Sequence, residues 1–452
     1  MNIVIIGDGK VGSTLSSQLQ KEGHDIVVID NNQNALKNLI NTQDVMCVEG
    51  NGALYEVQEE AGVPNADLVI ACTSMDELNM LCCLLSKKLG AKKTIARVRD
   101  PQYFKQLNIM KEELGLSMGI NPELAAATEI SRIMLFPAAA KIELFAKGKV
   151  ELVEFKLAAQ SMLDGMSLSE VYKKYKVKVL VCAVQRDGEI YIPDGDFRLR
   201  SGDKINLTAS HENIEKFFHT LGLLKDKSKT AIIVGGGKIA YYLTIALQKI
   251  GVKVKIIEKN YQRCMELSDL LPKASIIHGD GTDQDLLKEE GLEQVDAFAS
   301  LTGIDEENII MAMFASSLQV PKVAAKINRD SYAGMADMLG LESFVSPKNI
   351  TANHIVSYVR AMQNSLGSNI ETLYRLVDNQ VEALEFIARE DGPYIGVPLK
   401  DLRLKKNLLI ASIVRRRIPI IPGGNDKIEI GDSVIVVSRN QQLKDLKEIL
   451  QA

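Results

Sequence analysis

The stretch Asn2-Ile3-Val4-Ile5-Ile6-Gly7-Asp8-Gly9-Lys10-Val11-Gly12 decides how the chain begins to fold. Its first five residues form a short apolar run, which is typical of a strand buried on both faces. The glycines follow without a spacer, and residues 13–20 then carry the pattern of an amphipathic helix. A strand, a G-x-G-x-x-G turn and a helix in this order are the setting in which such a turn binds a dinucleotide.

The positions within this turn have separate roles in binding. Gly7 allows the tight turn, Gly9 lets the backbone approach a pyrophosphate, and Gly12 lets the helix pack closely on the strand. The free N–H groups at the helix N-terminus face the phosphates. A second apolar strand ends at Asp30, about 20 residues on, where an acid can bind a ribose hydroxyl and would repel a 2′-phosphate. We therefore predict an NAD(H)-type site, against the alternative of a tight turn that binds nothing.

Composition narrows the class of protein. With 452 residues the chain has room for two to four domains, and 54 basic against 58 acidic residues argues against non-specific nucleic-acid binding. No run approaches the roughly 18 apolar residues that span a membrane. Because a strand already begins at Asn2, we expect no signal peptide. The cysteines lie among apolar neighbours without C-x-x-C spacing, so we expect reduced core thiols in a cytoplasmic protein and no metal site.

Apolar strand segments alternate with helical segments through the first 135 residues. Strands are predicted at residues 2–6, 25–29, 45–48, 68–72 and 94–98, with helices between them, at 107–114 and from Pro122 to about Leu135. This alternation predicts a parallel, doubly wound sheet, whose ligands bind at the carboxyl ends of the strands.

From about Lys141 the pattern changes to that of a smaller α+β domain. Residues 151–157 alternate as a half-exposed strand does, 167–175 resemble a short helix, and strands are expected at 177–185, 188–193 and 202–207. This domain ends near Leu224, and residues 225–229 form a charged linker.

The pattern then starts again, which identifies a duplication. Gly7 corresponds to Gly235 and Asp30 to Glu258, both at an offset of 228 residues. Thr73, Asp76, Glu77 and Asn79 return as Thr302, Asp305, Glu306 and Asn308, at an offset of 229. Ile192-Pro193 recurs as Ile421-Pro422 in the smaller domain. The predicted fold class is α/β, with two Rossmann-like domains (1–138 and 229–366), each followed by a small α+β domain (139–225 and 370–452).

Each half carries its own set of candidate nucleotide-binding residues. They comprise the glycine turn, the acid after the second strand, a turn residue after the third strand, the start of the helix after the fourth strand, and a cation after the fifth. In the first half these are Gly7, Asp8, Gly9, Lys10, Val11, Gly12, Asp30, Asn51, Thr73, Ser74 and Arg97; in the second they are Gly235, Gly236, Gly237, Lys238, Ile239, Ala240, Glu258, Asp280, Thr302 and Lys326.

Several of these assignments have plainer alternatives. Arg97 and Lys326 could reach a phosphate or could be surface or interface charges. The residues after the third strands, Asn51 and Asp280, could touch adenine or ribose or could simply form turns. Thr73 and Thr302 could contact the ligand or could cap a helix. Ala240 replaces Gly12, so the two pockets are not identical.

No recognisable catalytic set accompanies the two turns. Of the five histidines only His278 lies near a nucleotide turn, and its counterpart in the first half is Glu49. A dehydrogenase needs an acid–base group beside the hydride. Together with the duplication, this favours a sensor over an enzyme, although a soluble NAD-dependent oxidoreductase stays open as an alternative.

These motifs together resemble the TrkA family of potassium-uptake regulators. The resemblance rests on Gly7–Gly12, Asp30, Gly50-Asn51-Gly52, Thr73–Asn79 and Ile95–Arg99, and it covers the whole chain as RCK-N, RCK-C, RCK-N, RCK-C. It implies a cytoplasmic subunit that binds NAD(H), or ATP or ADP at one or both sites. It also implies a homo-oligomeric ring, dimeric or tetrameric, on the inner face of a TrkH- or TrkG-type membrane potassium subunit. The helices from Pro122 to Leu135 and from Pro347 to Met362 are implied to cross to a neighbouring domain. A further alternative is an RCK-type sensor for another cation transporter.

Overall fold

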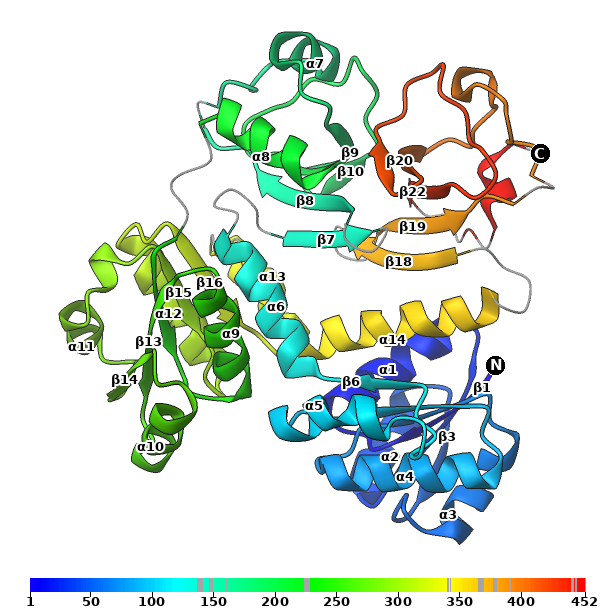
Figure 1. The fold of residues 1–452 in the computed structure, drawn as a ribbon, viewed down its shortest axis with the longest axis vertical. Coiled ribbons are helices and arrows are strands. Elements are labelled where there is room, and N and C mark those ends of the chain that lie inside the picture. The colour runs from blue at the N-terminus through cyan, green and yellow to red at the C-terminus, as the bar shows by residue number, and fades with distance from the viewer. Residues whose placement is uncertain are drawn as a thin grey trace. The chain divides into compact units, whose positions relative to one another are not determined.

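The computed structural model describes residues 1–135, 141–145, 149–159, 161–222, 228–339, 341, 343–364, 370–376, 380–389, 392–439, 443 and 445–451. They fall into two compact units. One unit contains residues 1–131 and 230–356, and the other contains residues 132–229 and 357–452. Each unit therefore combines segments from both halves of the duplication (Figure 1).

The first unit holds two six-stranded parallel sheets with the same strand order. In the first half the sheet runs β3-β2-β1-β4-β5-β6. Its strands are β1 (Asn2–Ile6), β2 (Asp25–Asp30), β3 (Met46–Glu49), β4 (Leu68–Ala71), β5 (Lys93–Arg97) and β6 (Met118–Ile120). Its helices are α1 (Lys10–Lys21), α2 (Gln33–Thr42), α3 (Tyr55–Glu60), α4 (Asp76–Leu89), α5 (Pro101–Met110) and α6 (Pro122–Leu135).

The second half repeats this arrangement as β14-β13-β12-β15-β16-β17. Its strands are β12 (Thr230–Val234), β13 (Lys253–Glu258), β14 (Ser275–His278), β15 (Ala297–Ser300), β16 (Lys322–Lys326) and β17 (Phe344–Val345). Its helices are α9 (Lys238–Lys249), α10 (Tyr261–Leu270), α11 (Gln284–Glu289), α12 (Asp305–Ser317), α13 (Asp330–Met338) and α14 (Pro347–Asn364). The predicted doubly wound parallel sheets are thus confirmed.

The second unit holds two five-stranded antiparallel sheets. The first, β10-β9-β11-β8-β7, consists of β7 (Lys141–Phe145), β8 (Val150–Lys156), β9 (Leu180–Arg186), β10 (Glu189–Tyr191) and β11 (Lys204–Ala209), with helices α7 (Leu168–Tyr175) and α8 (His211–Thr220). The second, β18-β19-β22-β20-β21, consists of β18 (Ile370–Leu376), β19 (Val381–Ile387), β20 (Leu408–Arg415), β21 (Ile418–Ile420) and β22 (Ser433–Arg439).

The cores follow directly from the strand sequences. Every residue of β4 and of β15 is buried, as parallel strands covered on both faces require. In the second unit, one hydrophobic cluster contains side chains of both antiparallel sheets, with Leu152 and Cys182 from the first packed among Val381, Ala411 and Ile435 from the second. The two small domains therefore share part of their core.

Two expectations about elements were wrong, and some short strands were missed. The helix predicted at 107–114 is α5, which begins earlier because the Asp100 side chain accepts a hydrogen bond from the amide of Gln102 and Pro101 occupies the first turn. The strand at 151–157 is mostly buried, not half-exposed, because its second face joins the shared cluster. The short strands β6 and β7 were not predicted at all.

Other predictions stay untested or are only partly covered. The proposed domain ends at 138, 225 and 366, and residues 225–227 of the charged linker, lie outside the described residues. Helix α6 ends at Leu135 as expected, and α14 extends to Asn364. Within the described residues, no helix combines the length and the apolar character that crossing a membrane requires.

Candidate functional site

The two glycine turns share one backbone conformation. Gly7 has φ of +104° and Gly235 has φ of +95°, a region that residues with a side chain rarely adopt. The amide of Gly7 donates to the carbonyl of Ile29, and that of Gly235 donates to the carbonyl of Ile257, each at 2.8 Å. Each turn is thus held against the end of the neighbouring strand, and the chain rises from it into α1 or α9.

The helices that follow the turns begin in open space. Gly9 and Gly237 are the N-cap residues of α1 and α9, and neither helix has a side-chain hydrogen bond at its cap. A Cβ atom added to either glycine would meet nothing within 4 Å. In contrast, the next helix in each half is capped by an asparagine side chain, Asn32 or Asn260. The free amides of α1 and α9 therefore face an unobstructed space that a phosphate group could occupy.

The acid at the end of the second strand accepts hydrogen bonds that hold each turn in place. In the first half the Oδ2 atom of Asp30 accepts from the amide of Asp8 at 2.6 Å, and its Oδ1 atom accepts from the amide of Asn32 at 2.8 Å. In the second half Glu258 accepts from the amides of Gly236 at 2.6 Å and Asn260 at 2.7 Å. Each carboxylate oxygen keeps a further lone pair, so these acids can still accept a hydrogen bond from a ribose hydroxyl.

A buried asparagine connects the loop after the fourth strand with the end of the fifth strand, beside the glycine turn. We call this loop and this strand end the rim of the site. The amide and the hydroxyl of Thr73 both donate to Oδ1 of Asn79 at 2.7 Å, and Nδ2 of Asn79 donates to the carbonyl of Arg97 at 2.9 Å. Asn308 repeats this arrangement, accepting from the amide and the hydroxyl of Thr302 at 2.8 and 2.9 Å. The loop after the fourth strand is therefore fixed to the end of the fifth strand in both halves.

Neither threonine is the N-cap residue of the helix that follows it. Helices α4 and α12 have Met75 and Ile304 as their N-cap residues, and neither cap has a side-chain hydrogen bond. The hydroxyls of Thr73 and Thr302 donate to the buried asparagines, which hold the threonine loops at the carboxyl edge of the sheet. They also accept from the amides of the N-cap residues Met75 and Ile304, at 3.4 and 3.2 Å.

The cations after the fifth strands are partly buried. The guanidinium of Arg97 donates to the carbonyl of Thr73 at 2.6 Å, while its Nε atom is buried and has no hydrogen-bond partner among the described residues. Nζ of Lys326 makes a long contact of 3.4 Å with the carbonyl of Leu301. Burial lowers the pKa of both side chains. A partly buried cation with unused hydrogen-bonding capacity at this edge of the sheet favours an anionic ligand.

The remaining predicted residues divide into backbone and side-chain candidates. Val11 and Ile239 are buried, so they can offer a ligand only their backbone. The side chains of Lys10 and Ser74 are exposed. Nζ of Lys238 lies 3.7 Å from Oδ2 of Asp100.

Asn51 and Asp280 act as turn residues in the structure. Oδ1 of Asn51 accepts from the amide of Ala53 at 3.0 Å, and Oδ1 of Asp280 accepts from the amide of Thr282 at 3.0 Å. Lys259 donates to Asp280 at 2.6 Å and is the leading reason that the pKa of this carboxyl falls to about 2. These contacts support the turn-forming alternative and leave a ligand contact as a prediction.

The two turns differ at three positions, and one of these differences, Val11 against Ile239, exchanges one buried aliphatic side chain for another. Asp8 has Gly236 as its counterpart, and a Cβ atom at Gly236 would lie 2.5 Å from Cδ1 of Leu267. A Cβ atom at Gly12 would lie 1.9 Å from the carbonyl oxygen of Gly7, although the second half carries Ala240 at this position. The first turn is therefore packed more tightly against its helix, and only the first turn carries a carboxyl group.

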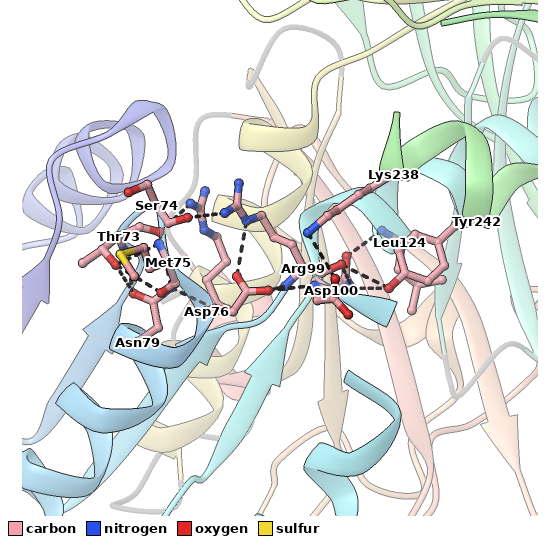
Figure 2. A network of polar contacts seen from close by, with 12 residues as sticks. Thr73, Ser74, Met75, Asp76, Asn79, Arg99, Asp100, Leu124, Lys238 and Tyr242 are labelled. Atoms are coloured by element: carbon pink, nitrogen blue, oxygen red, sulfur yellow. Dashed lines mark hydrogen bonds and ion pairs between the residues drawn. The ribbon is translucent and has the colours of Figure 1, made fainter. Parts of the chain in front are cut away.

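One buried carboxylate at the rim was not assigned a role from the sequence. Asp76 accepts from the amides of Arg99 at 2.8 Å and Asp100 at 2.7 Å, and from Nε of Arg99 at 3.3 Å (Figure 2). The guanidinium of Arg99 also donates to the carbonyl of Ser74. Asp305 accepts from two amides in the same way. The signal was present, because Asp76 and Asn79 both recur at the offset of 229 residues.

A cavity of about 680 Å³ lies in the antiparallel unit. Its walls are mainly aliphatic and aromatic side chains of the first small domain, including Tyr175 and Phe217, and Ile421 and Pro422 of the second small domain contribute to its lining. Within the part of the chain that the structure describes, no cluster of histidine, cysteine and acidic side chains suits a metal ion. The cysteines are free, and burial raises the pKa of Cys72 to about 12.

Comparisons with known proteins agree with this geometry. The TrkA-N domain model matches residues 3–122 and 231–347, and the TrkA-C domain model matches residues 152–222 and 383–451. A Trk system potassium uptake protein TrkA homologue of Methanosarcina mazei is 33% identical over 446 residues, covering 97% of each chain. The homologue of Archaeoglobus fulgidus is 32% identical over 451 residues and 100% of each chain, and the TrkA protein of Haemophilus influenzae is 29% identical over 459 residues.

Solved structures show the same fold. The crystal structure of the GsuK RCK domain has a TM-score of 0.64 at 17% identity and covers 97% of this chain and 92% of that one. The structure titled "GsuK channel bound to NAD" has the same TM-score and identity and covers 77% of that chain. The two parallel sheets with their glycine turns and the two antiparallel sheets are thus the TrkA-N and TrkA-C domains, each present twice, and the chain belongs to the TrkA family of Trk potassium uptake proteins.

Proposed function

We propose that the chain is a cytoplasmic regulatory subunit that binds NAD(H) or an adenine nucleotide and gates a TrkH- or TrkG-type membrane potassium channel or transporter. The observation that carries this proposal is the open space in front of Gly9 and Gly237, at two uncapped helix N-termini. Each of these spaces adjoins an acid suited to a ribose and lies at the edge where a partly buried cation ends the fifth strand.

The ligand class follows from the acids and the cations together. Asp30 and Glu258 disfavour a 2′-phosphate, which supports NAD(H) over NADP. NADH and ATP share an adenosine diphosphate and differ in the group beyond it. We assign the recognition of that difference to the rims, at Thr73 and Arg97 in the first half and at Thr302 and Lys326 in the second. A nucleotide gates a partner only through different affinities for two conformations of the assembly.

The proposal includes assembly and a membrane partner. The curated relatives are named as Trk system potassium uptake proteins, and a similar fold occurs in the GsuK channel. A chain of this family that acts on transport needs contact with a membrane subunit. We propose that this chain forms a homo-oligomeric ring on the inner face of that subunit, without hydride transfer.

Two alanine substitutions test the nucleotide sites with little effect on the fold. A Cβ atom at Gly9 or Gly237 meets no protein atom, and both residues have φ near −70°, which alanine adopts freely. The same Cβ atom would occupy the space of a bound phosphate. We expect Gly9→Ala to abolish binding to the first half and Gly237→Ala to abolish binding to the second, as measured by calorimetric titration with NADH, NAD⁺, ATP and ADP.

Gly334→Ala is the matched control, because its Cβ atom also meets nothing and it lies in α13, outside both turns. This variant should bind like the parent chain. If neither NADH nor ATP binds the parent chain, the proposed function is wrong. If both turn variants keep the full number of sites, nucleotides bind elsewhere.

Transport measurements separate the remaining alternatives. We expect the chain to change potassium flux through a co-reconstituted TrkH-type subunit several-fold when NADH is exchanged for ATP. Steady oxidation of NADH with a reducible substrate would instead favour the oxidoreductase alternative. Nucleotide binding without any effect on potassium flux would favour a regulator of another cation transporter.

A further inference from the structure

A tyrosine of the second half is bound to the rim of the first half. Tyr242 lies on α9, and its hydroxyl accepts from Nδ2 of Asn121 at 2.9 Å and donates to the carbonyl of Arg99 at 3.2 Å (Figure 2). Burial raises the pKa of Tyr242 to about 12, so the hydroxyl keeps the proton that it donates. Both contacts lie inside the parallel-sheet unit.

Hydrogen bonds continue from this contact to the first nucleotide site. The amide and the side chain of Arg99 donate to Asp76, the first residue of α4. One turn further along α4, Asn79 binds the amide and the hydroxyl of Thr73. Thr73 in turn accepts from the guanidinium of Arg97. Polar contacts at the two ends and the first turn of α4 between them therefore connect α9 with the rim of the first site.

The same helix carries the second glycine turn. Lys238 is the first residue of α9, directly after Gly237, and Tyr242 follows it by about one helical turn. A phosphate at this N-terminus that shifts the first turn of α9 also shifts the tyrosine hydroxyl against Arg99. Asp100, beside Lys238, is held by the same Asp76 carboxylate.

Among the described residues, the mirrored junction shows none of these contacts. Thr14 is the counterpart of Tyr242, and its hydroxyl donates to the carbonyl of Lys10 in its own helix at 2.8 Å. Ser346 is the counterpart of Asn121, and its Oγ atom is buried without a hydrogen-bond partner among the described residues. Arg329 replaces Asp100 and pairs with Glu306 at 3.1 Å. The contacts between the halves are therefore asymmetric.

We propose that the hydroxyl of Tyr242, through its junction with Asn121 and Arg99, carries the coupling between the two nucleotide sites. This inference rests on the proposed function and extends it, because it assigns the communication between the sites to one of two equivalent positions. Linkage requires the coupling factor to be equal in both directions. The asymmetry therefore concerns which residues transmit the coupling, not its direction.

The test measures the affinity of each site with the other site empty or filled. Titrations of Gly237→Ala and Gly9→Ala with NADH give the affinities of the first and second sites alone, and the parent chain gives both together. We expect occupancy of one site to change the affinity of the other by at least about fivefold. In the Tyr242→Phe background this factor falls to about one, because the ring stays and only the hydroxyl is lost.

Thr14→Val is the matched control, since it removes a hydroxyl at the equivalent position of the first half. It should leave the coupling factor unchanged. Tyr242→Phe should also leave the affinity of each site alone unchanged, which separates a loss of coupling from a general loss of structure.

The outcomes distinguish this inference from the proposed function. A chain that binds no nucleotide contradicts the proposed function itself. Two occupied sites with a factor of one in the parent chain overturn the coupling alone. Full coupling in Tyr242→Phe, loss of coupling in Thr14→Val, or a variant whose single-site affinities fall while the factor persists would each overturn the role of Tyr242.

Discussion

Asp8 is the residue at which the two glycine turns differ most in charge. Its carboxyl lies beside Asp30, and its Oδ1 atom is buried without a hydrogen-bond partner among the described residues. Burial, followed by the charge of Asp30, raises the pKa of Asp8 from 3.8 to about 6. At neutral pH the first turn therefore holds a carboxylate pair that the second turn, with Gly236, does not have.

This pair makes stability depend on pH in a defined direction. A carboxyl whose pKa is raised in the folded protein contributes stability below its unfolded pKa and loses it as the pH rises through about 6. We expect Asp8→Asn to raise the free energy of unfolding of the nucleotide-free chain by about 1 kcal/mol at pH 8, after allowing for solvent screening, and by much less at pH 4.5.

Urea denaturation at the two pH values measures this difference. Asp44→Asn, a change of an exposed acid outside the turn, serves as the control and should give no pH-dependent gain. An equal gain for Asp8→Asn at both pH values would show that the substitution acts through packing and not through charge.

Sequence patterns at the residue scale predicted the backbone better than the side-chain contacts. Gly7 and Asp30 were placed correctly by their spacing, since a strand, a tight turn and an acid about 20 residues on form a local pattern. Asp76 and Asn79 bind backbone groups at the end of β5 and just after it, 18 to 24 residues further along the chain. A local sequence pattern therefore does not predict these contacts. The contacts of Tyr242 could not be predicted from the sequence for the same reason, because its partners lie more than 100 residues away.

At the scale of elements, α4 and α12 hold the rims of the two sites in place, and we call these two helices the braces. Each begins with a buried aspartate and carries a fully buried asparagine one turn later. The helix therefore connects the loop after the fourth strand with the end of the fifth. Its sequence signature is a repeated Asp-x-x-Asn, which a duplicated chain reveals without further relatives.

Removing the asparagine should affect one half at a time. Asn79→Ala deletes the acceptor of Thr73 and the donor to the carbonyl of Arg97, so we expect a loss of about 2–3 kcal/mol in stability and at least about tenfold weaker nucleotide binding at the first site. Asn308→Ala should do the same at the second site.

Denaturant titration and calorimetry on both variants test this expectation. Asn79→Ala combined with Gly9→Ala should bind at the second site as Gly9→Ala alone does. Asn308→Ala combined with Gly237→Ala should bind at the first site as Gly237→Ala alone does. Weakening of both sites by either substitution would mean that the braces do not act locally.

Elements were predictable where their signals were strong and failed where the signals were short. The long apolar strands were found almost in full, whereas β6 and β17 contain three and two residues and give no periodicity. The helix predicted at 107–114 misses the start of α5, although Asp100-Pro101 is a helix-start signal.

At the scale of the whole molecule, the shared hydrophobic cluster joins the two TrkA-C domains. Ala411 of β20 is fully buried in it, as are Cys182 and Ala183 of β9. The sequence showed the duplication but not this joining, because the alternating pattern of 151–157 indicates one apolar face and does not reveal what covers the other. The two domains should therefore unfold together.

An acidic substitution in the cluster tests this cooperativity. We expect Ala411→Asp to cost more than about 3 kcal/mol and to remove hydrogen-exchange protection from β9 of the first TrkA-C domain as well as from β20 and β22. Ala297→Asp in β15 is the control, since it lies in the other compact unit and should leave protection of the TrkA-C pair unchanged. Loss of protection confined to β20 and β22 would contradict a shared core.

The replacement of Gly12 by Ala240 and of Asp8 by Gly236 has a genetic consequence. In a protein assembled from identical single-copy subunits, every point mutation appears at every equivalent site at once, and a harmful change has no unaltered counterpart. Here a single nucleotide substitution in the gene alters one turn and leaves the other turn of the same chain unchanged. Selection can therefore modify one copy while the second preserves the original property, so the duplication gives this family a route to two different ligand preferences inside a single gene product.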